Sequence, residues 1–157
     1  MPGESRAVAV GPGEGETVRS PIGGDVTFIA RGEQTNGALT ALEVGVPPGE
    51  GPPLHRHTRE EEWVHVLEGD LRWKLGDELR VTPAGSFVFI PRGLAHCFQN
   101  VGETPGRVLV TFTPAGMEGF FDRLSELTAF DLEAFRRAAA EHGMEVVGPP
   151  LIESDPL

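Results

Sequence analysis

Two short motifs constrain the fold of this chain more than any other feature of its sequence. The first motif holds two histidines and a glutamate between two glycines: Gly49, His55, His57, Glu62 and Gly69. The second holds a glycine, a proline-glycine turn, a histidine and an asparagine: Gly85, Pro91, Gly93, His96 and Asn100. Fifteen residues separate Gly69 from Gly85, which is enough for one short hairpin between two strands. The motifs therefore predict strands that carry polar, metal-binding residue types.

The spacing within each motif predicts where its side chains point. His55 and His57 are two residues apart, so on a strand both imidazoles project from the same face. Glu62 follows at an odd spacing, which requires a turn or bulge in the polar segment 58–61 if it is to share that face. His96 follows the turn at Pro91 and opens another strand. Because imidazole nitrogens and a carboxylate oxygen suit a divalent transition metal, the pattern indicates a metal site.

Short apolar or alternating runs, separated by turn residues, recur through the first two thirds of the chain. Asn36-Gly37 and Gly76-Asp77 are typical turn pairs. The segments expected to form strands are 26–30, 38–44, 63–67, 71–75, 78–81, 86–90 and 107–113. Many short strands with turns about every eight to twelve residues indicate an all-β sandwich or barrel. The length of 157 residues and the absence of an internal repeat predict a single domain.

The apolar period changes after Pro114. Residues at helical spacing predict an amphipathic helix: Met117, Phe120, Phe121, Leu124 and Leu127. Thr128–Asp131 resembles a capping box for a second helix that ends at Gly143. The expected organisation is a flexible tail over 1–16, a barrel over 17–115, helices over 116–145 and a second tail over 146–157. We expect the helices to cover one face of the barrel, with a lid or a wall of the pocket as the alternative.

The net charge, the cysteine content and the lengths of the apolar runs limit which kinds of molecule this protein is expected to bind. The formal net charge of −11 opposes binding to nucleic acid, whose phosphates attract a positive surface. Cys97 is the single cysteine, which excludes an intramolecular disulfide and favours a reducing, cytoplasmic location. No apolar run approaches the length that spans a membrane, so no membrane association is expected. The expected partner is a small molecule.

At the two motifs the chain resembles the cupin superfamily, and over residues 17–151 it is similar to small bacterial single-domain cupins of the quercetin-dioxygenase-like group. The resemblance implies a double-stranded β-helix, or jelly-roll barrel, with two C-terminal α-helices. It also implies one divalent transition metal per subunit (Fe, Mn, Ni, Co, Cu or Zn). By position in the motifs, the metal ligands are His55, His57, Glu62 and His96. Such cupins usually pair, so a homodimer is expected, which would also cover exposed sheet edges.

The resemblance implies a dioxygenase that acts on a small enol- or phenol-type molecule, with Glu62 as both ligand and catalytic base. A metal-dependent isomerase, cyclase or lyase is the alternative, and a non-catalytic small-molecule-binding cupin is the second alternative. The chain contains no tyrosine, which excludes cupin lyases and epimerases that use one. Phe98 shares the face of His96 and is expected to line the substrate pocket. Trp73 is a second pocket candidate with core packing as its alternative, and His65 is expected on the outer face.

Overall fold

The computed structural model describes residues 6–21 and 23–157 and consists mainly of two antiparallel sheets. The six-stranded sheet has the order β1-β2-β3-β10-β5-β8. Its strands are β1 (Glu16–Val18), β2 (Val26–Ala30), β3 (Thr40–Val46), β5 (Glu61–Glu68), β8 (Phe87–Ile90) and β10 (Gly106–Thr113). The five-stranded sheet has the order β11-β4-β9-β6-β7. Its strands are β4 (Pro53–His57), β6 (Leu71–Leu75), β7 (Glu78–Thr82), β9 (His96–Asn100) and β11 (Met144–Pro150).

Alternation of apolar side chains explains how the two sheets pack. Val26, Phe28 and Ala30 of β2 are buried while the residues between them are partly exposed, and β8 buries Val88 and Ile90. These inward faces enclose a core that includes Leu42, Val64, Leu71, Trp73 and Val108. The all-β jelly-roll fold with few helices is thereby confirmed, and every expected strand is present. The expected strand 38–44 lies two residues further along, as β3.

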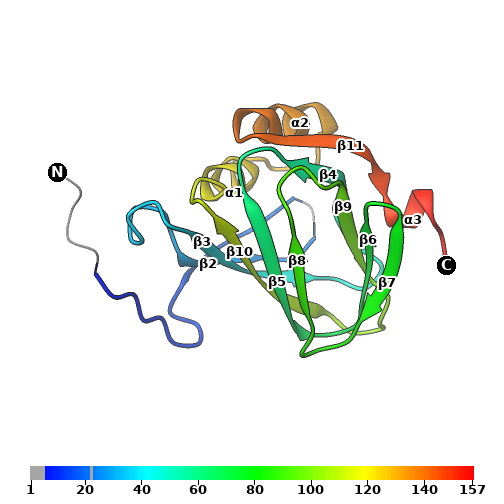
Figure 1. Ribbon diagram of the computed structural model, residues 1–157, viewed down its shortest axis with the longest axis horizontal. Coiled ribbons are helices and arrows are strands. Elements are labelled where there is room, and N and C mark those ends of the chain that lie inside the picture. Colours follow the sequence, from blue (N-terminus) through cyan, green and yellow to red (C-terminus); the bar gives the residue numbers. More distant parts are fainter. Residues whose placement is uncertain (1–5, 22) are drawn as a thin grey trace.

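Two helices follow the last strand of the six-stranded sheet, as expected. They are α1 (Glu118–Ser125) and α2 (Leu132–Glu141), and Figure 1 shows them side by side at one end of the barrel. The expected capping box at Thr128 is displaced, because the side chain of Asp131 caps α2 by accepting from the backbone of Glu133 and Ala134. Leu132, the first residue of α2, is exposed.

The C-terminal segment corrects the sequence prediction of a tail over 146–157. Met144–Pro150 forms β11, which pairs antiparallel with β4, the strand that carries two of the motif histidines. A short helix follows, α3 (Leu151–Ser154), and its Leu151 is fully buried. The expected N-terminal tail over 1–16 lies partly outside the described residues, and residues 6–15 contain no helix or strand. Nowhere in the described chain is a helix long and apolar enough to cross a membrane.

Candidate metal centre

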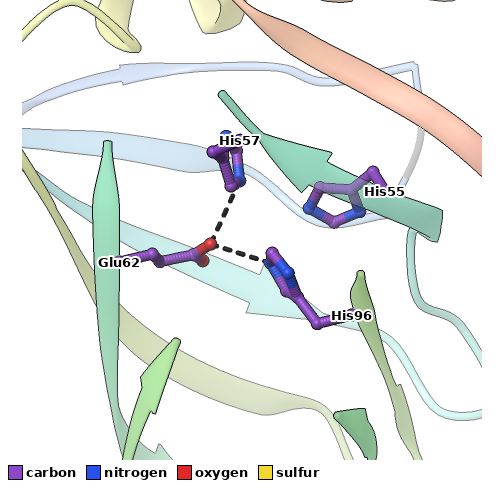
Figure 2. Close-up of side chains that lie close together, drawn as sticks. All are labelled: His55, His57, Glu62 and His96. Atoms are coloured by element: carbon purple, nitrogen blue, oxygen red, sulfur yellow. Dashed lines mark hydrogen bonds and ion pairs between the residues drawn. The ribbon is translucent and has the colours of Figure 1, made fainter. Parts of the chain in front are cut away.

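The four motif side chains converge inside the barrel from three strands. His55 and His57 lie on β4, His96 lies on the neighbouring β9, and Glu62 reaches across from β5 of the opposite sheet (Figure 2). All four are buried, and one ligand atom from each lies within 4.8 Å of the ligand atoms of the others. The structure therefore brings together every residue that the motifs singled out as a ligand.

Local structure explains how the odd spacing between His57 and Glu62 is accommodated. On β4 the two histidines point inward while Arg56 points outward and pairs with Glu145 of β11. The chain then leaves β4 at His57, turns, and re-enters as β5 in the other sheet. Thr58 anchors this turn by donating from its backbone and its hydroxyl to the carbonyl of Gly143. Glu62 therefore faces the histidines from across the barrel, and no bulge within one strand is needed.

Backbone carbonyls fix the orientation of two of the imidazole rings. His55 Nδ1 lies 2.7 Å from the carbonyl oxygen of Pro53, and His96 Nδ1 lies 2.9 Å from that of Leu94. A carbonyl can only accept, so in each ring Nδ1 carries the proton and donates. Nε2 then faces the cluster, and it is the nitrogen that such a histidine presents to a metal once it carries no proton.

The carboxylate of Glu62 is the electrostatic centre of the cluster. Its Oε2 lies 2.9 Å from His96 Nε2 and 3.1 Å from His57 Nε2. Burial alone raises the pKa of Glu62, but the charge of His96 and contacts with both imidazoles outweigh burial and hold that pKa well below its usual range. Burial, reinforced by the neighbouring imidazoles, lowers the pKa of His55 well below its ordinary value. An ionised carboxylate and a neutral imidazole are the protonation states that a metal requires.

The unsatisfied nitrogens of His57 indicate that the cluster fits a cation. Within the described part of the chain Nδ1 has no hydrogen-bond partner, and Nε2 makes a 3.1 Å ion-pair contact with the Glu62 carboxylate but no well-aligned hydrogen bond, although the side chain is almost completely buried. Buried polar atoms without a partner are uncommon and call for an explanation such as a bound ion. Three imidazole nitrogens and one carboxylate oxygen suit Fe, Mn, Ni, Co, Cu or Zn. The residues present therefore fit one divalent transition-metal ion.

A largely apolar cavity of about 130 Å³ adjoins the cluster. His55, His57 and Glu62 line its polar end, and Phe98 lines its wall. Gly51 lets the loop before β4 pack directly on β9, because a Cβ there would lie 1.7 Å from the carbonyl oxygen of Phe98. The cavity thus begins at the candidate ligands and extends into apolar surroundings.

Trp73 is not among the residues that line the cavity, which corrects its assignment as a pocket residue. Its side chain is fully buried and its indole N–H donates to Thr82. Its ring centroid lies 5.0 Å from that of Phe98, so Trp73 supports the cavity wall from behind. Both side chains point into the barrel, but of the two only Phe98 lines the cavity.

The two helices form a wall of the cavity, which was the alternative to simple packing on a barrel face. Side chains of α1, α2 and the residues beside them line the cavity: Met117, Phe120, Phe121, Leu124, Phe135 and Met144. Sequence reasoning missed Phe112, which lies opposite Glu62 in the register between β10 and β5. Only the inward position of Phe112 on its strand could have signalled this role. The helices therefore form part of the pocket, as well as packing on the barrel.

Three further histidine and cysteine side chains lie elsewhere in the structure. His65 is exposed on the outer face of β5, beside Phe87. Cys97 is buried on the opposite side of β9 from His96, and burial raises the pKa of its thiol to about 11. His142 ends α2 and its Nδ1 lies 2.7 Å from the carbonyl oxygen of Ala138. None of the three belongs to the cluster.

Comparisons with known proteins agree with this fold and site. Residues 42–112 match the family Cupin_2, described as a cupin domain. A curated relative is the polyketide synthase CurC of Streptomyces cyaneus, which is 29% identical over 126 residues, covering 72% of this chain and 82% of CurC.

Solved structures include a recombinant oxalate oxidase in complex with glycolate, with 32% identity, a TM-score of 0.53 and coverage of 60% of this chain. The chain spans 53% of that oxidase. The polyketide cyclase RemF of Streptomyces resistomycificus has a TM-score of 0.59 at 22% identity, covering 69% of this chain and 80% of RemF. At that identity the likeness to RemF concerns the fold.

Proposed function

The chain belongs to the cupin family, and from that premise we propose that it is a metal-dependent dioxygenase of the quercetin-dioxygenase-like kind. Its substrate would be a small organic molecule with an enol or phenol group. The observation that carries this proposal is the position of the candidate ligands at one end of an otherwise apolar cavity. A substrate that matches such a cavity has one ionisable oxygen and an apolar body.

In this proposal Glu62 removes the proton of the substrate hydroxyl. Its lowered pKa keeps the carboxylate ionised and ready to accept a proton, but makes it a weak base on its own. A bound divalent metal supplies Lewis acidity, which lowers the pKa of a coordinated hydroxyl. Apolar side chains such as Phe112 and Phe98 exclude water and hold the body of the substrate.

Similarity to the oxalate oxidase supports an oxidative reaction. In a dioxygenation both atoms of O2 enter the organic product, so the reaction needs no external reductant. None of the residues that border the cavity is a cysteine or a tyrosine that could take part in redox chemistry. The redox partner of O2 in the proposed reaction is therefore the electron-rich enolate or phenolate itself.

A non-oxidative cyclase, isomerase or lyase is a second candidate, because a buried carboxylate beside a candidate metal site can move a proton without any oxidant. The same Glu62 would remove a proton next to a carbonyl that the metal polarises, and no O2 would be consumed. Tyrosine cannot assist because the chain has none. The two candidates therefore share a site and differ in their need for oxygen and for a redox-active metal.

Oxygen uptake by reconstituted protein tests the proposal. The protein is loaded separately with Fe, Mn, Ni, Co, Cu or Zn and offered a panel of phenols and enols in an oxygen electrode. We expect oxygen uptake with at least one redox-active metal, loss of uptake in Glu62→Gln, and retention in the control His65→Gln, whose side chain is exposed on the outer face. Conversion without oxygen uptake, equally fast with zinc, would favour the cyclase class. If the protein binds metal but converts none of the phenols and enols, the non-catalytic binding function is favoured.

The outer face of β8 and β5 supports the further proposal of a homodimer. Phe87 and Phe89 are 57% and 52% exposed, although the alternate residues of β8 are buried in the core. In the register, Phe89 lies opposite Trp63 and Phe87 opposite His65. Such an aromatic patch is typical of an interaction surface.

A second copy of this chain is the occupant that this patch fits best. The aromatic centre carries no acidic residue, and the Arg92–Glu61 ion pair beside it is already satisfied within the chain. Two chains of net charge −11 can therefore meet at this neutral surface while most of their acids stay in solvent. The β8 strand is also the last strand of its sheet, and a dimer would protect that edge.

A further inference from the structure

We propose that the cavity admits a single-ring phenol or enol and excludes fused-ring molecules, with Phe121 of α1 as the residue that sets this limit. The inference deepens the proposed function by naming the class of substrate that the same site takes. Only the expectation of an ionisable oxygen rests on that function. The limit on ring size rests on the volume and walls of the cavity.

The volume of the cavity matches one aromatic ring. An engineered apolar cavity of about 150 Å³ in another protein binds benzene, and the cavity here measures about 130 Å³. A metal ion at the polar end would occupy part of this space, so the comparison sets an upper bound on the ligand. A second fused ring fits inside this volume only if side chains or backbone of the wall move.

The wall itself is a series of aromatic rings that runs from the candidate ligands to the helices. The ring of His57 lies 5.1 Å from that of Phe112, and Phe112 lies 6.4 Å from Phe121. Phe121 lies 5.2 Å from Phe120, which packs in turn on Phe135 of α2 at 5.4 Å. Aromatic walls pack well against the edge or face of a planar ring. Phe121 of α1 belongs to this series and is half-buried. It lies between the polar end of the cavity and α2.

Strong polar contacts hold α1 in place, so the wall resists displacement. Arg31 of the segment after β2 makes two hydrogen bonds to the Asp122 carboxylate, at 2.8 and 3.0 Å. Glu118 accepts from the backbone N–H of Gly32 at 2.7 Å and from that of Gly116 at 2.9 Å, and also contacts the Thr40 hydroxyl. These contacts tie both ends of the first turn of α1 to the six-stranded sheet. These contacts oppose displacement of α1 by a larger ligand.

The entrance adds a preference of charge. Gly23 and Glu50 line the cavity and are also exposed at the surface. They lie on neighbouring loops, since a Cβ on Gly23 would lie 3.8 Å from the Glu50 carboxylate. A carboxylate at the entrance disfavours ligands that carry further anionic groups. The class that fits is therefore a neutral monocyclic phenol or enol that loses its proton only inside.

Binding of two matched probes to the zinc-loaded wild-type protein tests the size limit. Catechol has one ring, and 2,3-dihydroxynaphthalene has the same chelating oxygens on two fused rings. Met117 and Met144 both line the cavity, so 13C-methyl methionine NMR reports binding inside it. We expect catechol to shift both methyl signals and the naphthalene to bind roughly tenfold or more weakly. Equal or tighter binding of the naphthalene would overturn the inference.

The role of Phe121 is tested with Phe121→Ala and the control Phe130→Ala, whose ring is exposed outside the cavity. In Phe121→Ala the affinity ratio between the probes should fall roughly tenfold, because the second ring gains space. The control should keep the wild-type ratio, and an unchanged ratio in Phe121→Ala would refute the role of this residue.

These measurements separate the inference from the proposed function. If the probes bind with the expected discrimination but no phenol is converted, the proposed enzyme activity fails and the ring-size limit stands. If phenols are converted without discrimination by ring size, the limit fails and the proposed function stands. To keep the size limit testable without metal, benzene and naphthalene are titrated into the metal-free protein with the same methionine signals. Only benzene should shift them.

Discussion

Glu62 Oε2 lies 2.9 Å from His96 Nε2, although the two residues are 34 positions apart and belong to opposite sheets. His57 approaches the same oxygen from a third strand at 3.1 Å. A single carboxylate oxygen therefore holds together side chains from both walls of the barrel. The close approach depends on the whole fold, since no local segment contains both sheets.

Removal of the carboxylate of Glu118 should weaken the protein in a pH-dependent way. Burial raises the pKa of Glu118, but hydrogen bonds from Thr40 and from backbone N–H groups outweigh it and lower that pKa. The folded state therefore favours the ionised form, which stabilises the protein above the ordinary glutamate pKa. This stabilisation is lost as the pH falls through the lowered pKa of the folded state.

We expect Glu118→Gln to lose about 1–3 kcal/mol of unfolding free energy at neutral pH. Urea unfolding between about pH 3 and pH 7 should show a weaker acid dependence in the variant than in the wild type. Glu126→Gln is the matched control, because Glu126 makes an exposed ion pair with Arg123 at the other end of the helix. An unchanged pH profile in Glu118→Gln would contradict the anchoring role.

Polar residues at the outer face of β8 should convert a dimer into a monomer. We expect light scattering to give the wild type a mass of twice 16.9 kDa, and Phe87→Ser with Phe89→Ser a mass of one chain. Phe130→Ser is a fair control because that ring is equally exposed on a different surface. A monomeric wild type, or a double variant that still dimerises, would rule out this interface.

The C-terminal segment offers a sharp test of whether it is part of the fold. Leu151 is fully buried, whereas the adjacent Ile152 is 55% exposed. Leu151→Ala should therefore lose about 2–5 kcal/mol of unfolding free energy, while Ile152→Ala should change it by less than about 0.5 kcal/mol. Chemical unfolding of both variants measures the difference. Equal, small effects would mean that the segment is a tail after all.

The sequence predicted strands, the two helices and the converging ligands because periodicity and spacing report which face of a strand each residue occupies. It failed at β11, where residues 146–157, which include Gly148, Pro149 and Pro150, were expected to form a tail. Proline is tolerated there because β11 is the last strand of its sheet and has an unpaired side. That position depends on tertiary pairing with β4, which the local sequence does not report.

The pocket shows the same limit of sequence reasoning. Alternation placed Phe98 inside the barrel, Trp73 was a pocket candidate with core packing as its alternative, and both side chains are inside. Which inward residue borders empty space depends on how the side chains fill the interior, and Trp73 lies behind Phe98. The contribution of α1 and α2 to the cavity depends likewise on how the helices dock through Arg31 and Glu118.

Metal content of the purified, untagged protein tests the central claim most directly. Elemental analysis of the wild type, of His96→Ala and of the outer-face control His65→Ala gives the stoichiometry of each. The site predicts about one transition-metal ion per chain in the wild type and in the control, and clearly less than one in His96→Ala, which lacks one of the four ligands. A folded wild-type protein that contains no metal and takes up none on reconstitution would contradict the account.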